Sequence, residues 1–296
     1  MRRRKIGDRM GRAGAWLLIL GMLAGAAVAQ ASPQGELPQA PSTLSQPAQP
    51  VAPPAKTPPQ AKTQEEYNAF LQMEKITDPA AAEKAADDFA AKFPESELRA
   101  LFYYRVMTLY QAARNREKTI AMGRKVVALN PNEPVTLATL AEVLGESVSE
   151  TDPQRDLHLR EVVTFAQRAL QTVDTDLLFP PNASPQVIAG NRNLIRSIAY
   201  EALALANMAR DEETQAEANL KQAIELNTVD PDPVTWLRYA IVLDHLRRYP
   251  EALTSANRAL ELSPAGSAQA SMATSERDRL LKLTGAAGAA PAAKAK

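Results

Sequence analysis

The sequence predicts an all-α fold, a solenoid of about five antiparallel helix pairs followed by a C-terminal capping helix. Apolar residues recur at helical spacing from about residue 64 to residue 284, and no run of alternating apolar and polar residues is long enough for a strand. Aromatic residues make up 5% of the chain, and Ala and Leu dominate its apolar fraction, which favours helices over strands. Helix starts are indicated where a capping side chain precedes a proline, at Asp78-Pro79, Asp152-Pro153, Ser184-Pro185 and Asp232-Pro233.

Residues 1–29 have the pattern of a secretory signal peptide. Six cations and one anion, Asp8, precede an apolar run from Ala15 to Ala29. The small residues Ala27 and Ala29 predict cleavage before Gln30, and cleavage after Ala31 is the less favoured alternative. Without a Cys, the segment cannot become a lipoprotein anchor. We therefore expect an exported protein, periplasmic after cleavage or anchored in the inner membrane if the signal is kept.

Residues 30–63 predict a disordered tether rich in Pro, Gln and Ala. They hold nine of the 22 prolines and almost no large apolar side chain, so they cannot bury enough surface to offset the entropy of ordering. A proline-motif ligand for another domain is the alternative interpretation. At the other end, residues 285–296 are expected to form a disordered Ala/Lys tail, which leaves 64–284 as the folded domain.

Within the folded domain, helices are expected in successive pairs. Their approximate ranges are 64–76, 79–93, 97–113, 116–129, 134–146, 153–173, 185–209, 212–227, 233–247, 250–262 and 268–283.

Self-comparison shows a repeat of large and small residues. It is clearest at Trp236, Tyr239, Ala240, Leu243, Ala252, Ala256, Ala259 and Pro264. The same offsets carry Tyr103, Val106, Met107, Tyr110, Thr119, Gly123, Val126 and Pro131, and then Tyr200, Leu203, Ala204, Asn207, Ala216, Leu220, Ala223 and Thr228. Large side chains on a first helix need small ones on the second if the pair is to stack closely on its neighbour. This pattern resembles the tetratricopeptide repeat (TPR), as in exported bacterial TPR-containing proteins.

The resemblance is strong at 233–266, fair at 100–133 and 197–230, and weaker elsewhere. A polar, acidic insert over 145–152 delays the second helix of one unit, and residues 174–189 separate that unit from the next. The first pair, 64–94, has Glu66 where a large apolar residue belongs, so we interpret it as a divergent terminal unit.

The resemblance implies a partner-binding concave face lined by the first helix of each pair. Transferred to this sequence, the face comprises Tyr104, Arg105, Thr108, Ala138, Glu142, Glu201, Leu205, Met208, Leu237, Ile241 and His245. Leu205, Met208, Leu237 and Ile241 are equally consistent with core positions under a neighbouring helix.

The residue inventory offers little for catalysis. There is no Cys, His158 and His245 are the two histidines, and adjacent Asp244 and His245 point about 100 degrees apart on a helix. We therefore expect no catalytic, cofactor-binding or metal-binding residues and no cofactor. Without residues 1–29 the chain carries 28 cations and 33 anions, which gives no electrostatic basis for binding nucleic acid.

The sequence thus predicts an exported, non-enzymatic protein-protein interaction module whose partner is a protein or peptide, with membrane contact only through an uncleaved signal. The alternative is a structural accessory subunit of an envelope or outer-membrane assembly complex. Phe93-Pro94-Glu95-Ser96 at the turn of the first units loosely resembles outer-membrane assembly lipoproteins built from such repeats, although the missing Cys counts against direct kinship.

Overall fold

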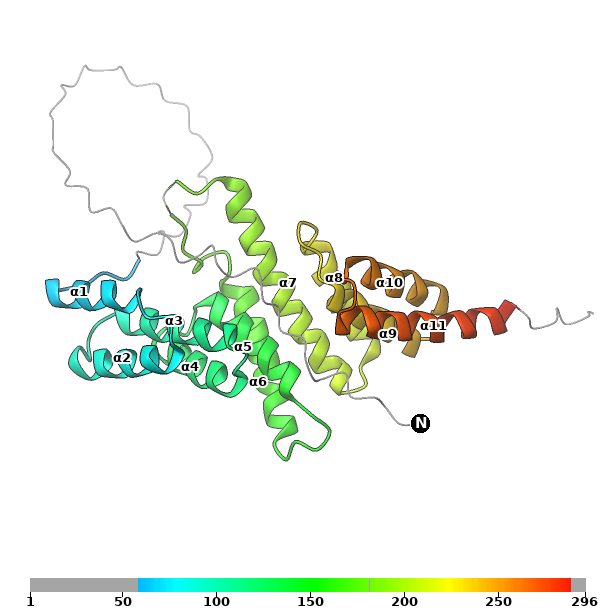
Figure 1. Cartoon of the computed structure of the whole chain (residues 1–296), viewed down its shortest axis with the longest axis horizontal. Coiled ribbons are helices and arrows are strands. Elements are labelled where there is room, and N and C mark those ends of the chain that lie inside the picture. Colours follow the sequence, from blue (N-terminus) through cyan, green and yellow to red (C-terminus); the bar gives the residue numbers. More distant parts are fainter. Residues whose placement is uncertain (1–57, 181, 289–296) are drawn as a thin grey trace, which may run out of the picture.

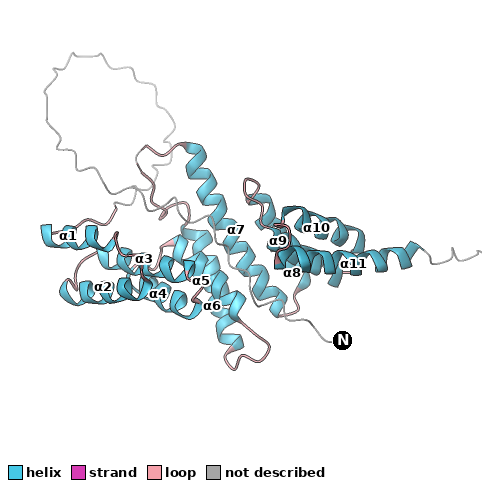
Figure 2. Cartoon of the chain, in the orientation of Figure 1, coloured by secondary structure: helices cyan, strands magenta, loops and turns pink. Residues whose placement is uncertain are grey.

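The computed structural model describes residues 58–180 and 182–288, which contain helices and no strand. The described helices run in this order: α1 (Gln64–Met73), α2 (Pro79–Lys92), α3 (Leu98–Ala112), α4 (Arg116–Leu129), α5 (Pro134–Ser147), α6 (Arg155–Thr172), α7 (Pro185–Ala209), α8 (Glu213–Leu226), α9 (Pro233–His245), α10 (Tyr249–Leu262) and α11 (Ala268–Gly288). The all-α prediction is confirmed for these residues (Figure 2).

The helices form antiparallel pairs that stack in chain order (Figure 1). The pairs are α1/α2, α3/α4, α5/α6, α7/α8 and α9/α10, and α11 packs against α10 and α9 at the C-terminal end. Five pairs and a capping helix are the predicted architecture.

Three of the four predicted cap-proline starts begin helices. Asp78, Ser184 and Asp232 each accept a hydrogen bond from the backbone N–H three residues further on, at 2.7, 3.3 and 3.1 Å, and a proline follows in the first turn. The side chain satisfies an N–H that has no partner inside the helix, and the proline lacks the N–H that would otherwise need one.

The fourth predicted start, Asp152-Pro153, is wrong, because α6 begins at Arg155. One carboxylate oxygen of Asp152 accepts from the backbone N–H of Gln154 at 2.8 Å, and the other lies 2.7 Å from Nδ1 of His158. Asp152 therefore closes the loop before the helix instead of capping its first turn.

Three turns inside the pairs share one backbone conformation, which supports the repeat seen in the sequence. Arg114, Asp211 and Arg247 have φ of 57°, 61° and 61°. In each turn the next N–H bonds to a carbonyl five residues earlier, at 2.9, 3.0 and 2.9 Å. The α5/α6 pair lacks this turn, and residues 148–154 connect its helices instead, as the predicted insert requires.

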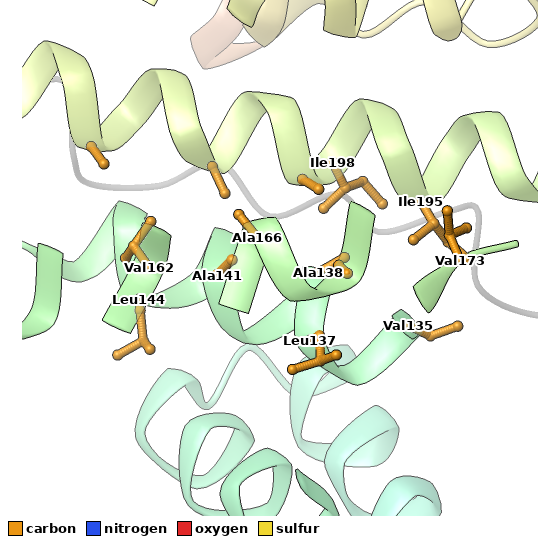
Figure 3. Close-up of a cluster of buried hydrophobic side chains, with 14 of the residues drawn as sticks. Val135, Leu137, Ala138, Ala141, Leu144, Val162, Ala166, Val173, Ile195 and Ile198 are labelled. Carbon is orange, nitrogen blue, oxygen red and sulfur yellow. The ribbon is translucent and has the colours of Figure 1, made fainter. Parts of the chain in front are cut away.

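The central cluster of the core joins α5, α6 and α7 (Figure 3). It comprises Val135, Leu137, Ala138, Ala141, Leu144, Leu159, Val162, Ala166, Ala169, Val173, Leu177, Ile195, Ile198, Ala199, Ala202 and Ala206. A second cluster fills the space between α1, α2, α3 and α4, where the rings of Phe89 and Phe102 stack with centroids 4.0 Å apart. The core is therefore distributed along the stack, as repeat packing predicts.

Helix α7 has 25 residues and separates the two ends of the stack (Figure 1). Ala199, Ala202 and Ala206 lie in the central cluster, whereas Ala204 packs in another cluster with Ala216 of α8. Small side chains on both sides let α7 lie closely between its neighbours. Figure 1 also shows its first turns projecting beyond α5 and α6.

The ends of the domain differ slightly from the predicted boundaries. Helix α1 ends at Met73 and not near 76, and α11 continues to Gly288, four residues past the predicted boundary at 284. Before α1, Ala61 packs against the second cluster, and the backbone N–H of Lys62 donates to the Glu66 carboxylate at 2.7 Å. This bond accounts for the buried Glu66 at a repeat position where an apolar residue was expected. The predicted signal peptide, most of the predicted tether and the end of the predicted tail lie outside the described residues.

Candidate functional site

The predicted face falls on the first helices α3, α5, α7 and α9, but the structure divides its residues by burial. Four are buried within this chain: Ala138, Glu142, Glu201 and Leu237. One residue, His245, is exposed. The other six are partly exposed: Tyr104, Arg105, Thr108, Leu205, Met208 and Ile241. The partly exposed group and His245 form what we call the first-helix face.

The α3 portion of the first-helix face is held by local contacts. The ring of Tyr104 packs between the central and second clusters, and burial, together with the charge of Glu133, raises the pKa of Tyr104 above its ordinary value. The Thr108 hydroxyl donates to the Arg105 carbonyl at 2.7 Å. Nη2 of Arg105 lies 3.5 Å from the Ile76 carbonyl, and Nε of the same guanidinium is buried without a hydrogen-bond partner.

The α7 and α9 portions contain apolar side chains in partial contact with the core. Leu205 contacts α5, where a Cβ placed on Gly145 would lie 3.2 Å from Cδ1 of Leu205. Met208 packs beside Leu220 and Val242, and Ile241 beside Leu237 and Ala259. Of these four apolar residues, Leu237 lies in the core, whereas Leu205, Met208 and Ile241 lie at core edges and stay partly exposed.

A buried charge network crosses the first helices beside this face. Arg238 of α9 donates through Nη1 to Glu201 of α7 and through Nη2 to Glu146 of α5, the latter at 2.9 Å. The Thr235 hydroxyl donates to the second oxygen of Glu201 at 2.9 Å. Nη2 of Arg116, on α4, lies 3.5 Å from the other oxygen of Glu146.

The network keeps Arg238 charged. Burial alone would lower the pKa of the Arg238 guanidinium, but the negative charges of Glu201 and Glu146 outweigh burial and raise this pKa above its ordinary value. Charged groups out of water need close partners of opposite sign, and here each carboxylate has one.

Sequence reasoning named Glu201 but missed Arg238 and Glu146. One local signal was available for Arg238, which lies three residues before Ile241 and therefore shares its helix face. No local signal links it to Glu146, since their contact depends on how three units stack.

The two histidines each meet one carboxylate. Nδ1 of His245 lies 2.7 Å from Glu213 of α8, and Nδ1 of His158 lies 2.7 Å from Asp152. Asp244, the sequence neighbour of His245, pairs instead with Arg279 of α11, so the two residues face different helices as expected. In the described ranges, no three or more His, Asp or Glu side chains are grouped so that they could hold a metal ion.

The described part of the chain has a TPR-like fold, in which antiparallel helix pairs with a recurrent turn stack in order. No protein-family model matches the sequence, and no curated protein matches it.

The solved structures that resemble the chain include the following two. TTC0263, a thermophilic TPR protein of Thermus thermophilus, is 17% identical with a TM-score of 0.43, and the match covers 74% of this chain and 98% of that one. The assembly chaperone of RpL4 (Acl4, residues 1–338) is 11% identical with a TM-score of 0.40, over 76% of this chain and 98% of that one.

Proposed function

We propose that this protein is an exported, non-enzymatic module that binds another protein or peptide through its first-helix face. The observation that carries the proposal is that first helices α3, α7 and α9 each keep apolar or basic side chains partly exposed at the predicted positions, among them Arg105, Met208 and Ile241. Stacked repeats present extended surfaces of this kind, with contact positions contributed by several units.

The chemistry of the face suits a mixed contact. Met208 and Ile241 offer apolar surface, and the unbranched thioether chain of methionine adapts its shape to different partners. Arg105 offers a planar cation with several donors, suited to a carboxylate or a backbone carbonyl of the partner. We therefore expect a partner segment that combines an apolar side chain with an acidic one.

Affinity capture from envelope extracts tests the binding proposal. The full chain with a C-terminal tag is the bait, and the test variant carries Met208→Ser together with Ile241→Ser. The control is Gln167→Ser, at an exposed position of the second helix α6. Circular dichroism checks that all three proteins keep the same helix content.

The proposal requires a specific protein that the wild type and the control recover equally and the double variant recovers poorly. Equal recovery by all three proteins would rule out the first-helix face. A partner that co-purifies in fixed stoichiometry and resists high salt would favour the accessory-subunit alternative over a reversible module.

Export rests on residues 1–29 and is tested separately. No helix in the described ranges is both long and apolar enough to cross a membrane. Fractionation followed by N-terminal sequencing decides between the two expected states. An N-terminus at Gln30 in the periplasmic fraction supports cleavage, an intact N-terminus in the membrane fraction supports an anchor, and recovery in the cytoplasm contradicts export.

A further inference from the structure

The ion pair between Glu146 and Arg238 skips a unit of the stack. Glu146 belongs to the α5/α6 pair and Arg238 to the α9/α10 pair, with the α7/α8 pair between them. In a solenoid each repeat ordinarily contacts only its neighbours, so the overall curvature follows from small rotations added pair by pair. A direct bond between the α5/α6 pair and the α9/α10 pair constrains two of these rotations at once.

The contact is well buried and strongly directional. The side chains of Arg238, Glu146 and Glu201 are 8%, 12% and 1% exposed. The planar guanidinium holds its N–H groups in a rigid geometry. Nη1 of Arg238 donates to Glu201 of α7, and Nη2 donates to Glu146 of α5. Arg238 can therefore bond both carboxylates at once only when the three first helices keep one mutual spacing.

A change in that spacing would remove the closest partner of a buried carboxylate. If α9 moved away from α5, Glu146 would lose its close contact with Arg238 and keep only Arg116, at 3.5 Å. Weakening the pairing of a buried charge is costly, and a charged hydrogen bond depends more strongly on distance and angle than the apolar contacts that α7 makes with its neighbours, such as that of Ala204 with Ala216. The polar contact is thus the more sensitive to the angle between units.

We propose that Arg238 and Glu146 form a latch that fixes the curvature of the stack from α5 to α10. Glu201 holds the Arg238 guanidinium in place from the intervening helix, and Arg116 supports Glu146 from α4. When the latch is broken, the α9/α10 pair rocks relative to the α5/α6 pair while the helices themselves persist. The latch is a property of the chain alone and does not depend on the binding proposal.

Distance measurement between spin labels tests the latch, and the chain's lack of cysteine makes labelling specific. Labels are placed on Gln167→Cys of α6 and Asn257→Cys of α10, both exposed positions, in the full chain. The test variant is Glu146→Gln, which removes the charge and keeps the size. The control is Glu213→Gln, a similarly buried carboxylate whose partner, His245, lies on the adjacent helix.

Double electron-electron resonance should give a broader distance distribution for Glu146→Gln, shifted from that of the wild type. The control should match the wild type, and circular dichroism should show unchanged helix content in both. An unchanged distribution in Glu146→Gln would overturn the latch. If Glu146→Gln loses its helix signal, Glu146→Asp decides, because this variant keeps the charge but shortens the reach: broadening supports the latch and no change overturns it.

Discussion

Arg238 and Glu146 are 92 residues apart in the sequence, and their side chains lie 2.9 Å apart in the fold. Glu201 bonds the same guanidinium from the helix between them. This relationship connects units that the repeat pattern alone would leave separate. It also explains why Glu201, predicted on the binding face, is buried within the chain.

Replacing Arg238 by Met should lower the free energy of unfolding by about 3–5 kcal/mol, because Glu201 would stay buried without its cation. The control is Lys84→Met, which breaks an exposed pair with Asp88 and should change stability by about 0.5 kcal/mol or less. Urea unfolding of the full chain measures both. Similar midpoints for the two variants would show that the buried network contributes no more than a surface pair.

Gly123 marks a close approach of α4 and α5. A Cβ at this position would lie 2.7 and 2.9 Å from Cδ2 and Cγ of Leu140, which is fully buried. Gly123→Ala should therefore destabilise the fold by about 1–2 kcal/mol, since the overpacking cost exceeds the gain in helix propensity.

The matched control is Gly190→Ala in α7, where nothing lies within 4 Å of the added Cβ. Because the added methyl group meets no other atom, only the higher helix propensity of Ala acts at this position. Thermal unfolding should show stabilisation by about 0.5–1 kcal/mol. If both substitutions stabilise the chain, the α4–α5 contact is looser than the structure indicates.

Ala240 and Ala259 were predicted from the repeat as close-contact points, and both are fully buried, beside Leu243 and Leu237 respectively. Leu at either position should cost about 1–3 kcal/mol, because the added methylenes have no room. Ala128→Leu on the exposed side of α4 should stay within about 0.5 kcal/mol of the wild type. Equal melting temperatures for all three variants would contradict the assigned interfaces.

Local sequence signals were sufficient for most of the fold. Helical periodicity and caps such as Ser184-Pro185 depend on residues within one or two turns, so they located the helices and their order. The helix start predicted at Asp152-Pro153 was wrong because the Asp152 carboxylate bonds to His158, six residues away, instead of capping the helix. That competition depends on the loop conformation and not on the motif.

The candidate site was predicted less well, because its burial depends on contacts between units. Ala138 and Leu237 occupy first-helix positions that the repeat assigns to an open face, yet both are core in this chain. Spacing within a repeat shows which side of a helix a residue is on. It does not show how sharply the stack curves, and that curvature decides which positions stay accessible.

A hydrogen-bonded tyrosine gives the stack a pH dependence in alkali. The Tyr103 hydroxyl donates to Asp87 at 2.8 Å, and Lys125 donates to the same oxygen at 2.7 Å. Burial and the bond to Asp87 raise the pKa of Tyr103 from its ordinary value of 10 to about 12, because both favour the neutral phenol.

The raised pKa fixes the sign of the effect. In the unfolded chain Tyr103 ionises near pH 10, whereas in the folded chain it keeps its proton until about pH 12. Its contribution to stability is therefore complete below pH 10 and is lost as the pH rises to 12. Tyr103→Phe lacks this titration and keeps Asp87 and Lys125, so the stability difference between wild type and variant should shrink from about pH 10 upwards. Urea unfolding at pH 8, 10 and 11 measures this difference, and a constant value across the three would show that the Asp87 bond does not hold the proton on Tyr103.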